Sequence, residues 1–457
     1  MIDLISRFFK FEERKTNIST EALAGFTIFT AMSYIIFLQP SIMTGKEVGI
    51  DTGMDMAALI TGTCIASAVG CFLMGILANY PIGLAPGMGG NFLLVITVIP
   101  AVAVILGKEV GSAAVWQVAL GLVFVSGLLF IILTFFNVRQ LFMHAISPSL
   151  KAAISAGIGI FITIVGLKNG HIIEVAQNTG FVLTADLRQS SVIIFFIGLI
   201  AITSFCVLKI KGGVLYGIII AAIVSLLVGE IKYNGIVDMP ASMAPVFAKL
   251  DITTVLKNIV AFIPLIIVLT FLDIFDTMGT LIGVGTHAGL MKNGKLDHAS
   301  QAFASDSVAT LFGSVCGHST VTCYIESATG VEVGGRTGFA AIITGIFFLL
   351  ALFFQPVVLA VSEFKPITAP ALVVVGAMMM KSAREIDWDD YSESVPAFLI
   401  LVGVPLTYSI AYGMMLGFVA YPIVKLLTGK GKKIGYLNYI MGAILLVYLL
   451  WIKPKGG

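Results

Sequence analysis

The chain has 457 residues, of which 58% are hydrophobic and 11% are charged, and its formal net charge is +2. Soluble domains carry about 25% charged residues, so the composition excludes a soluble protein. There is no basic tract of the kind that binds nucleic acid, and the five cysteines match no zinc site and predict no disulfide. Long apolar runs instead predict membrane-spanning helices, whereas a β-barrel would show short alternating segments.

Residues 1–20 are expected to form a cytoplasmic amphipathic leader. The first of them, "MIDLISRFFKFEERKT", alternate apolar and charged side chains. This pattern suits a short helix on the membrane surface, and it equally suits a plain charged leader before the first span. No cleavable signal peptide is evident.

Fourteen apolar segments follow and predict an all-α polytopic membrane protein. The first seven are 21–43, 56–79, 84–107, 115–136, 150–167, 190–208 and 213–229. After an extracytoplasmic connection, 230–255, the second seven are 256–285, 301–316, 318–334, 338–360, 368–381, 395–408 and 411–428. A basic loop and an extra apolar segment occupy 429–457, and its run 436–452 either spans the membrane or lies against the bundle.

Seven spans in each half make the second half enter the membrane from the opposite side, which is the signature of an inverted repeat. Lys and Arg are concentrated in the loops on the side of the N-terminus. The positive-inside rule therefore places the N-terminus in the cytoplasm. We expect a multi-pass protein of the cell membrane, surrounded by the lipid bilayer.

The third span of each half is interrupted. In the first half it reads "YPIGLAPGMGGNFLLV", Tyr80 to Val95, and is broken by prolines and glycines. In the second half it contains "GHSTVTCYIESATG", Gly317 to Gly330, which is rich in hydroxyl and β-branched residues. Irregular backbone at membrane depth is tolerated only inside protein or facing a water-filled cavity. Interrupted segments at corresponding positions of two halves point to the substrate site of a transporter.

Acidic residues lie at the same depth. Asp273 and Asp276 are three residues apart in "LTFLDIFDTMGTL" and share a helix face. A charge at the bilayer centre costs about 2.5–3.5 kcal/mol on insertion scales, so we expect these acids and Glu326 to be functional. They are candidates both for substrate binding and for carrying a coupling proton, although sodium coupling stays open. The Asn91 amide offers a donor and an acceptor.

Other residues of these segments complete the predicted lining of the site. Tyr34, Phe271 and Tyr324 would either stack on a flat ligand or simply pack. Met88, Gly89 and Thr322 belong to the broken segments themselves. His318 is expected at the outer edge of the protein. No metal site and no cofactor are predicted.

Three motifs, "APGMGGN", "FLDIFDTMGTL" and "STVTCYIESATGVEVGGRTG", resemble those of the AzgA-like purine permeases, which belong to the nucleobase/cation symporter and nucleobase–ascorbate transporter superfamily. The resemblance extends roughly from Thr20 to Trp451. It implies a 7+7 inverted fold with a core domain (21–136 and 256–360), a gate domain (137–229 and 361–428) and a short strand in each of segments 3 and 10. It also implies a possible homodimer. Carried over by motif, the purine-binding polar residues are Asn91, Asp273, Asp276 and Glu326.

The chain departs from that family in three places. It reads "GMGGNF" where the family has "GMGLNA", it has His318 where a small hydroxyl residue is usual, and it has Leu38, Gln39 and Pro40 in place of "VNP". The changes around Asn91 put the preferred base in doubt.

The predicted function is import of a purine base (hypoxanthine, guanine or adenine) by proton symport and alternating access. A carboxylate accepts strong hydrogen bonds from the N–H groups of such a base. Xanthine or uracil as cargo and sodium as coupling ion are the nearest alternatives. An anion transporter of related fold would need a positive binding centre. The scattered histidines do not suit an enzyme, and a channel would not need buried titratable acids.

Overall fold

A computed structural model of the chain describes residues 2–135, 147–176, 180–183, 186, 188–232, 234–292 and 295–451. The start of the predicted gate at 137–146 and the residues 452–457 of the predicted C-terminal segment lie outside this description. Helices dominate, and within the described residues ten are long and apolar enough to cross a membrane. Two shorter apolar helices, Gly213–Val228 and Tyr391–Thr407, add to these.

In the first half, most predicted spans are single helices, but segment 3 is split by a strand. Asn17 caps the first long helix, because its side chain accepts from the Thr20 N–H at 2.9 Å. The elements are α1 (Ile2–Phe9), α2 (Ile18–Met32), α3 (Ile35–Met43), η1 (Lys46–Val48), α4 (Met56–Leu73), η2 (Met74–Ala78), β1 (Leu84–Pro86), α5 (Met88–Leu93), η3 (Leu94–Val98), α6 (Ile99–Leu106), α7 (Ala113–Phe135), α9 (Pro148–Asn169), β2 (Ile173–Ala176), β3 (Gly180–Leu183), α10 (Ser190–Val207) and α11 (Gly213–Val228).

The second half repeats this plan, with a long first helix and a strand in segment 10. The predicted spans 301–316 and 318–334 correspond to α14 and to the stretch from β6 to α15. The elements are α12 (Ile252–Lys257), α13 (Ile259–His287), β4 (Met291–Lys292), β5 (Lys295–Leu296), α14 (Ala299–Val315), β6 (Val321–Cys323), η4 (Ile325–Ser327), α15 (Ala328–Glu332), α16 (Gly338–Ala351), η5 (Leu352–Phe354), α17 (Gln355–Glu363), α18 (Lys365–Met379), η6 (Met380–Glu385), α19 (Tyr391–Thr407), α20 (Ile410–Leu427), η7 (Gly431–Lys433) and α21 (Tyr436–Trp451).

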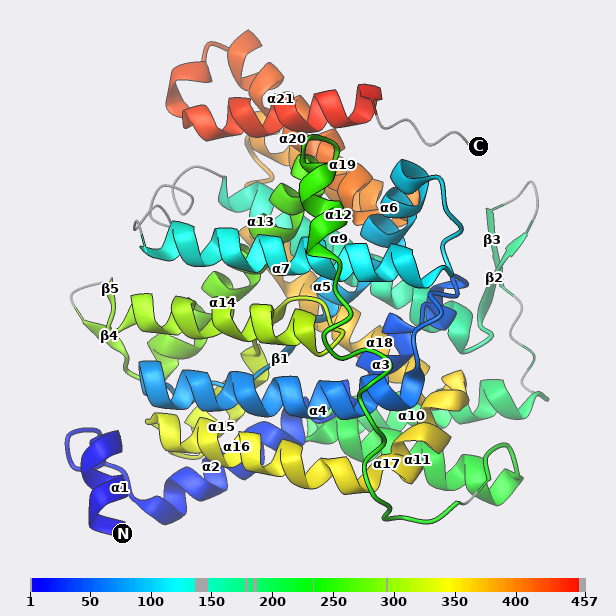
Figure 1. Cartoon of the computed structure of the whole chain (residues 1–457), viewed down its shortest axis with the longest axis vertical. Helices are drawn as coiled ribbons and strands as arrows, with labels where there is room; N and C mark the ends of the chain where they lie inside the picture. The colour runs from blue at the N-terminus through cyan, green and yellow to red at the C-terminus, as the bar shows by residue number, and fades with distance from the viewer. Residues whose placement is uncertain are drawn as a thin grey trace.

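The long helices run side by side, as α4, α7, α14 and α16 do in Figure 1, and they pack in two groups. In the group that we call the core, α2 and α4 pack on α16, and α7 packs on α13 and α14. In the group that we call the gate, α9 packs on α18 and α19, α10 packs on α11 and α18, and α19 packs on α20. The interrupted segments β1 and β6 belong to the core.

The two ends of the bundle can be told apart by their hairpins. In Figure 1, α1 and the β4–β5 hairpin lie at one end, which we call the N-side, and the β2–β3 hairpin lies at the other. The Arg14 guanidinium lies 3.8 Å from the Asp297 carboxylate and joins the leader to the N-side. Helix α21 packs on α20, and its 16 residues are about 24 Å long, which is less than the hydrocarbon thickness of a bilayer.

Two glycines allow α9 and α18 to approach closely within the gate. A Cβ atom added to Gly159 would lie 2.7 Å from the backbone oxygen of Gly376, and one added to Gly376 would lie 2.4 Å from the backbone oxygen of Gly159. Non-bonded carbon and oxygen atoms do not approach each other to such distances. Small residues at such crossings are a common means of packing helices in membranes.

Gly159→Ala is therefore expected to push these two helices apart and to lower the free energy of unfolding by about 1–3 kcal/mol, the usual cost of overpacking. Thermal unfolding of the purified protein in detergent measures the loss. Gly279→Ala is the matched control, because a Cβ at Gly279 meets nothing within 4 Å. Equal stability of the two variants would contradict the prediction.

Candidate functional site

The interrupted segments of the two halves meet as an antiparallel pair, β1 with β6. This confirms the strands expected in segments 3 and 10. Beyond the paired residues, the Gly87 N–H donates to the Thr320 carbonyl at 2.9 Å, and the Tyr324 N–H donates to the Gly83 carbonyl at 3.0 Å. The pair thus satisfies backbone groups that cannot form a helix at membrane depth.

Small residues after β1 let the two segments lie close together. A Cβ atom on Gly87 would lie 2.7 Å from the Thr322 methyl group, and one on Gly90 would lie 2.4 Å from Thr320 Oγ1. Gly90 is one of the two positions, with Phe92, at which "GMGGNF" departs from the family's "GMGLNA". Here Thr320 occupies the space that a larger side chain would need.

Two carboxylates beside the strand pair belong to side chains that are not fully buried. Asp276 lies in the middle part of α13, yet its side chain is exposed, and Glu326 in η4 is partly exposed. Asp276 Oδ2 lies 3.6 Å from the place that a Cβ on Gly87 would take. The two carboxyls interact electrostatically, and the Tyr34 hydroxyl donates to Glu326 Oε1 at 2.8 Å. We call Asp276, Glu326 and Tyr34 the acidic site.

An exposed strip on α13 leads from the acidic site to the N-side. Gly279, Ile282 and Thr286 are exposed and lie on the same side of the helix as Asp276. Ile325, beside Glu326 in the chain, is 54% exposed. Exposed side chains of α13 therefore extend from the acidic site toward the N-side.

At the opposite end, core and gate are joined around Glu47, whose carboxylate is 1% exposed. It accepts from the Ser41 hydroxyl and from the side-chain amide of Asn169 at the end of the gate helix α9. Burial raises the pKa of Glu47, while the Ser41 bond, the Lys365 charge and the Asn169 bond lower it. Lys365, which begins the gate helix α18, donates to the Lys46 carbonyl at 2.5 Å. These contacts hold core and gate together at this end.

Asp273 lies apart from the acidic site, in contact with α14. It is 2% exposed, and its partner carboxyl, Asp306 of α14, is 0% exposed. The Cys323 thiol donates to Asp306 Oδ1 at 3.5 Å. The pair lies beside β6, where Cys323 contacts Asp306. We call Asp273 and Asp306 the buried pair.

Sequence reasoning did not single out Asp306. The signal was present, because "AFASDSVATLF", residues 302–312, places a carboxylate inside an apolar segment, as in the case of Asp273. In the part of the chain that the structure describes, no group of three or more His, Cys, Asp or Glu residues could hold a metal ion.

The residues after β1 are buried between core and gate. Asn91 is 0% exposed, its Oδ1 accepts from the Ser319 hydroxyl, and its Nδ2 has no partner. Met88 is buried, and a Cβ on Gly89 would lie 3.6 Å from a methyl group of Ile158 in the gate helix α9. This segment therefore lies where the two groups of helices meet.

The three aromatic residues predicted near the ligand have different surroundings. Tyr34 belongs to the acidic site through its bond to Glu326. The Tyr324 hydroxyl donates to the Pro86 carbonyl at 2.6 Å and so ties η4 to β1. Phe271 is 6% exposed and stacks on Phe275 with 5.8 Å between ring centroids. Thr322, the last predicted lining residue, lies with its hydroxyl 2.8 Å from that of Thr277.

His318 is completely buried, which corrects its expected place at the outer edge. Its Nδ1 lies 2.6 Å from Nε2 of Gln39, and Oε1 of Gln39 accepts from the Thr63 hydroxyl at 2.8 Å. The imidazole can be buried because an amide partner lies beside it. His318 and Gln39 are both positions at which the sequence departs from the family motifs described above, and here the two side chains contact each other.

This contact predicts an energetic coupling. His318→Ala and Gln39→Ala each leave a buried partner unsatisfied and are each expected to lower the free energy of unfolding by about 1–3 kcal/mol. The double variant should lose less than the sum, by about 0.5–3 kcal/mol, because one interaction is removed twice. Denaturation of all four proteins in detergent measures the cycle, and additive losses would refute the coupling.

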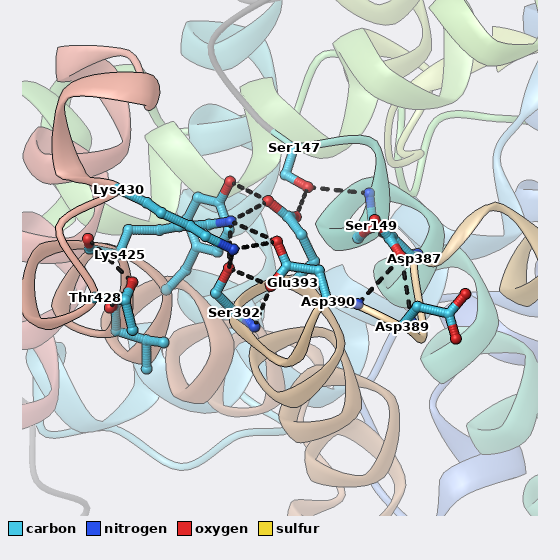
Figure 2. Close-up of polar contacts among 12 residues, drawn as sticks. Ser147, Ser149, Asp387, Asp389, Asp390, Ser392, Glu393, Lys425, Thr428 and Lys430 are labelled. Atoms are coloured by element: carbon cyan, nitrogen blue, oxygen red, sulfur yellow. Dashed lines mark hydrogen bonds and ion pairs between the residues drawn. The ribbon is translucent and has the colours of Figure 1, made fainter.

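A second polar cluster lies within the gate (Figure 2). The side chain of Lys425 in α20 is only 6% exposed, and its Nζ lies 2.6 Å from Glu393 Oε1 in α19. Glu393 also accepts from the Ser147 hydroxyl at the start of α9 and from the Tyr421 hydroxyl, the latter at 2.9 Å. A buried ion pair therefore joins three gate helices.

The outer part of this cluster binds the loop after α20. Lys430 Nζ lies 2.8 Å from Asp390 Oδ2, and the Ser392 N–H donates to Asp390 Oδ1 at 2.9 Å. The Lys430 ammonium, together with the bonds from Ser392, holds the pKa of the Asp390 carboxyl well below its usual range. The cluster stabilises the gate and lies apart from the strand pair.

Comparison with known proteins agrees with this architecture. Residues 19–416 match the Permease family. A putative permease of Methanocaldococcus jannaschii is 40% identical, with 99% of this chain and 100% of the relative covered. The guanine/hypoxanthine permease PbuG of Bacillus subtilis is 40% identical over 98% of this chain and 99% of the relative. The adenine permease AdeQ of Escherichia coli is 35% identical over 98% and 96%. These relatives confirm the resemblance to purine permeases seen in the motifs.

Solved structures of other transporters share the fold. The transmembrane domain of the cyanobacterial bicarbonate transporter BicA matches with a TM-score of 0.63 and 13% identity, covering 87% of this chain and 96% of that domain. SLC26A9 matches with a TM-score of 0.62 and 14% identity, covering 90% of this chain and 66% of that one. At such low identity the likeness concerns the fold, and it confirms the expected 7+7 inverted-repeat class.

Proposed function

The chain belongs to the Permease family, and from that premise we propose that it imports purine nucleobases into the cell by proton symport. Relatives named for guanine, hypoxanthine and adenine support a purine as the cargo. The family also makes the protein a transporter and not an enzyme. The observation that carries the proposal is the acidic site, in which two accessible carboxylates lie beside the strand pair.

The chemistry of the acidic site suits a neutral base that carries N–H groups. Carboxylates accept strong, charge-assisted hydrogen bonds, and Asp276 and Glu326 come from different segments of the second half. Tyr34 orients Glu326 through its hydroxyl. The unpartnered Nδ2 of Asn91 supplies a donor for an acceptor of the ring. Met88, Gly89, Thr322 and Tyr324 would complete the lining, and Phe271 would pack behind it.

The accessibility of the site supports alternating access. Exposed residues lead from Asp276 to the N-side, while Glu47 and Lys365 join core and gate at the other end. With the N-terminus in the cytoplasm, this is an inward-facing state. Movement of the core against the gate would break the Glu47–Asn169 contact and open the outer end.

An anion is a poorer cargo for this site, although the proteins of similar fold include a bicarbonate transporter. Two carboxylates repel an anion, and the exposed side of α13 presents Asp276 instead of a basic residue. A base with polar N–H groups is attracted instead, because its N–H groups donate hydrogen bonds to the carboxylates.

Uptake into proteoliposomes tests the proposal. Labelled hypoxanthine, guanine, adenine, xanthine and uracil are offered under an imposed proton gradient, under an imposed sodium gradient and without either. We expect at least one purine to accumulate under the proton gradient and to be competed by the unlabelled base. Accumulation of none of the five would refute the cargo, and accumulation driven by sodium alone would refute proton coupling.

A further inference from the structure

We propose that the buried pair, Asp273 with Asp306, is the site that holds the coupling proton, and that the acidic site contacts the base. This inference rests on the proposed function, because it assigns the proton of the same symport reaction. In the sequence analysis, Asp273, Asp276 and Glu326 were candidates both for binding the base and for carrying the proton. The proposal gives these two tasks to different residues.

The first observation is that two buried carboxyl oxygens beside β6 have no hydrogen-bond partner. Asp273 Oδ1 and Asp306 Oδ2 are both buried and both lack a hydrogen-bond partner. The two carboxyls are close enough to interact electrostatically. In the part of the chain that the structure describes, no ion pair reaches either of them. Two ionised carboxylates side by side in a dry interior repel strongly, and a proton on one of them removes this repulsion.

The second observation is a count of hydrogen atoms around Thr310. Its Oγ1 lies 3.1 Å from Asp273 Oδ2, 3.1 Å from the Val321 carbonyl oxygen and 3.0 Å from the Val321 nitrogen. A hydroxyl has one hydrogen and two acceptor positions. It accepts from the Val321 N–H and donates to one of the two oxygens, so the remaining contact needs a hydrogen from elsewhere. All three contacts are satisfied when Asp273 carries a proton on Oδ2 and donates it to Thr310.

The third observation is that donors lie on one side of Asp306. The Cys323 thiol lies 3.5 Å from its Oδ1, and the Cys323 backbone and the Thr277 side chain also favour its charged form. Donors favour an ionised carboxylate. The pair therefore holds one proton, on Asp273, with Asp306 as the charged neighbour. The titratable groups that face the pair are Asp276 on α13 and Cys323 on β6.

The position of the pair connects the proton to the cargo. Thr310 binds the backbone of Val321, and Asp306 binds Cys323, so the two acids hold the residues on either side of Thr322. Loss of the proton would leave Thr310 with one hydrogen for two acceptors, Asp273 and the Val321 carbonyl, and would shift β6, which forms one wall of the site. The exposed Asp276 interacts with both members of the pair and offers the route by which a proton reaches them.

The first test needs no substrate. Infrared spectra of the purified protein should contain the carbonyl-stretch band of a protonated carboxyl at neutral pH, and Asp273→Asn should remove it. Asp238→Asn, in an exposed loop, is the control and should leave the band unchanged. Thr310→Val keeps both acids and should shift the band, because the hydroxyl is the partner of the proton. A wild-type spectrum without the band, or a band unmoved in Asp273→Asn, would overturn the proposal.

The second test separates binding from coupling. Asp273→Asn and Asp306→Asn should bind hypoxanthine within about threefold of the wild type and still exchange it across the membrane. Both should lose accumulation driven by a proton gradient. Asp276→Asn should instead lose binding itself. Accumulation at the wild-type level in both variants of the pair would refute the inference, whereas a wild type that binds no base would refute the proposed function and leave the infrared result to judge the pair.

Discussion

Replacing Glu326 with glutamine is expected to lower purine affinity by about 100-fold or more while leaving the fold intact. A hydrogen bond to a charged group contributes about 1.5–3 kcal/mol, and tenfold in affinity corresponds to about 1.4 kcal/mol. Glutamine also places an NH2 donor where the base presents its own N–H. The Tyr34 hydroxyl can still donate to the glutamine oxygen, so the local structure is preserved. Equilibrium binding of labelled hypoxanthine to protein in detergent measures the effect.

Two further variants make this result specific. Glu332→Gln changes a carboxylate in the adjacent helix α15 whose side chain is 64% exposed and pairs with Lys211, so binding should stay at the wild-type level. Tyr34→Phe keeps the carboxylate but removes the group that orients it, and an intermediate loss of about tenfold is expected. Wild-type affinity in Glu326→Gln would show that the acidic site does not bind the base.

Replacing Lys425 with methionine should be the most destabilising single change in the gate. Methionine fills a similar volume but leaves Glu393 largely buried without its counter-charge. Breaking a buried pair by removing one partner costs about 3–5 kcal/mol. The substitution removes the ion pair between α20 and α19, and its effect extends to α9 because Glu393 also binds Ser147 (Figure 2). Thermal unfolding in detergent should show a clearly lower midpoint than that of the wild type.

Lys430→Met is the matched control for that change. Lys430 belongs to the same cluster and pairs with Asp390, but its side chain is 39% exposed. Exposed pairs contribute about 0–1 kcal/mol, so this variant should unfold close to the wild type. Similar losses in the two variants would mean that burial is not what makes the Lys425 pair important.

The broken segments were predictable because their composition conflicts with their surroundings. An apolar membrane helix is disfavoured by the prolines and glycines around Leu84 and by the hydroxyl residues around Thr322. The backbone of these segments therefore has to form its hydrogen bonds inside the protein. Asp276 and Glu326 were predicted by the same reasoning, since a carboxylate at membrane depth needs a purpose. Their proximity comes from packing within the second half, where α13 contacts β6 and η4.

Other contacts depend on which way side chains point between helices, and no spacing in the sequence reveals that. Gln39 and His318 lie in different halves, and each departs from the family by itself, so their contact becomes visible only when α3 and the loop before β6 are brought together. Lys425 resembles an ordinary charge at a helix end, yet α19 buries it. The distinction between Asp276 and Asp273 likewise depends on the rotation of α13, which exposes one and buries the other.

The pairing of β1 with β6 has a consequence for how the protein is made. Leu84 and Cys323 are strand partners, and roughly half of the chain separates them. At 5–20 residues per second, a ribosome needs roughly 10–50 seconds to cover that distance. During this interval the first strand waits without its partner, and Cys71, which contacts both the N–H and the carbonyl of Leu84, satisfies part of its backbone. The acidic site is thus completed late in translation, and a nascent chain stalled before Val321 would hold an unpaired strand within the bilayer.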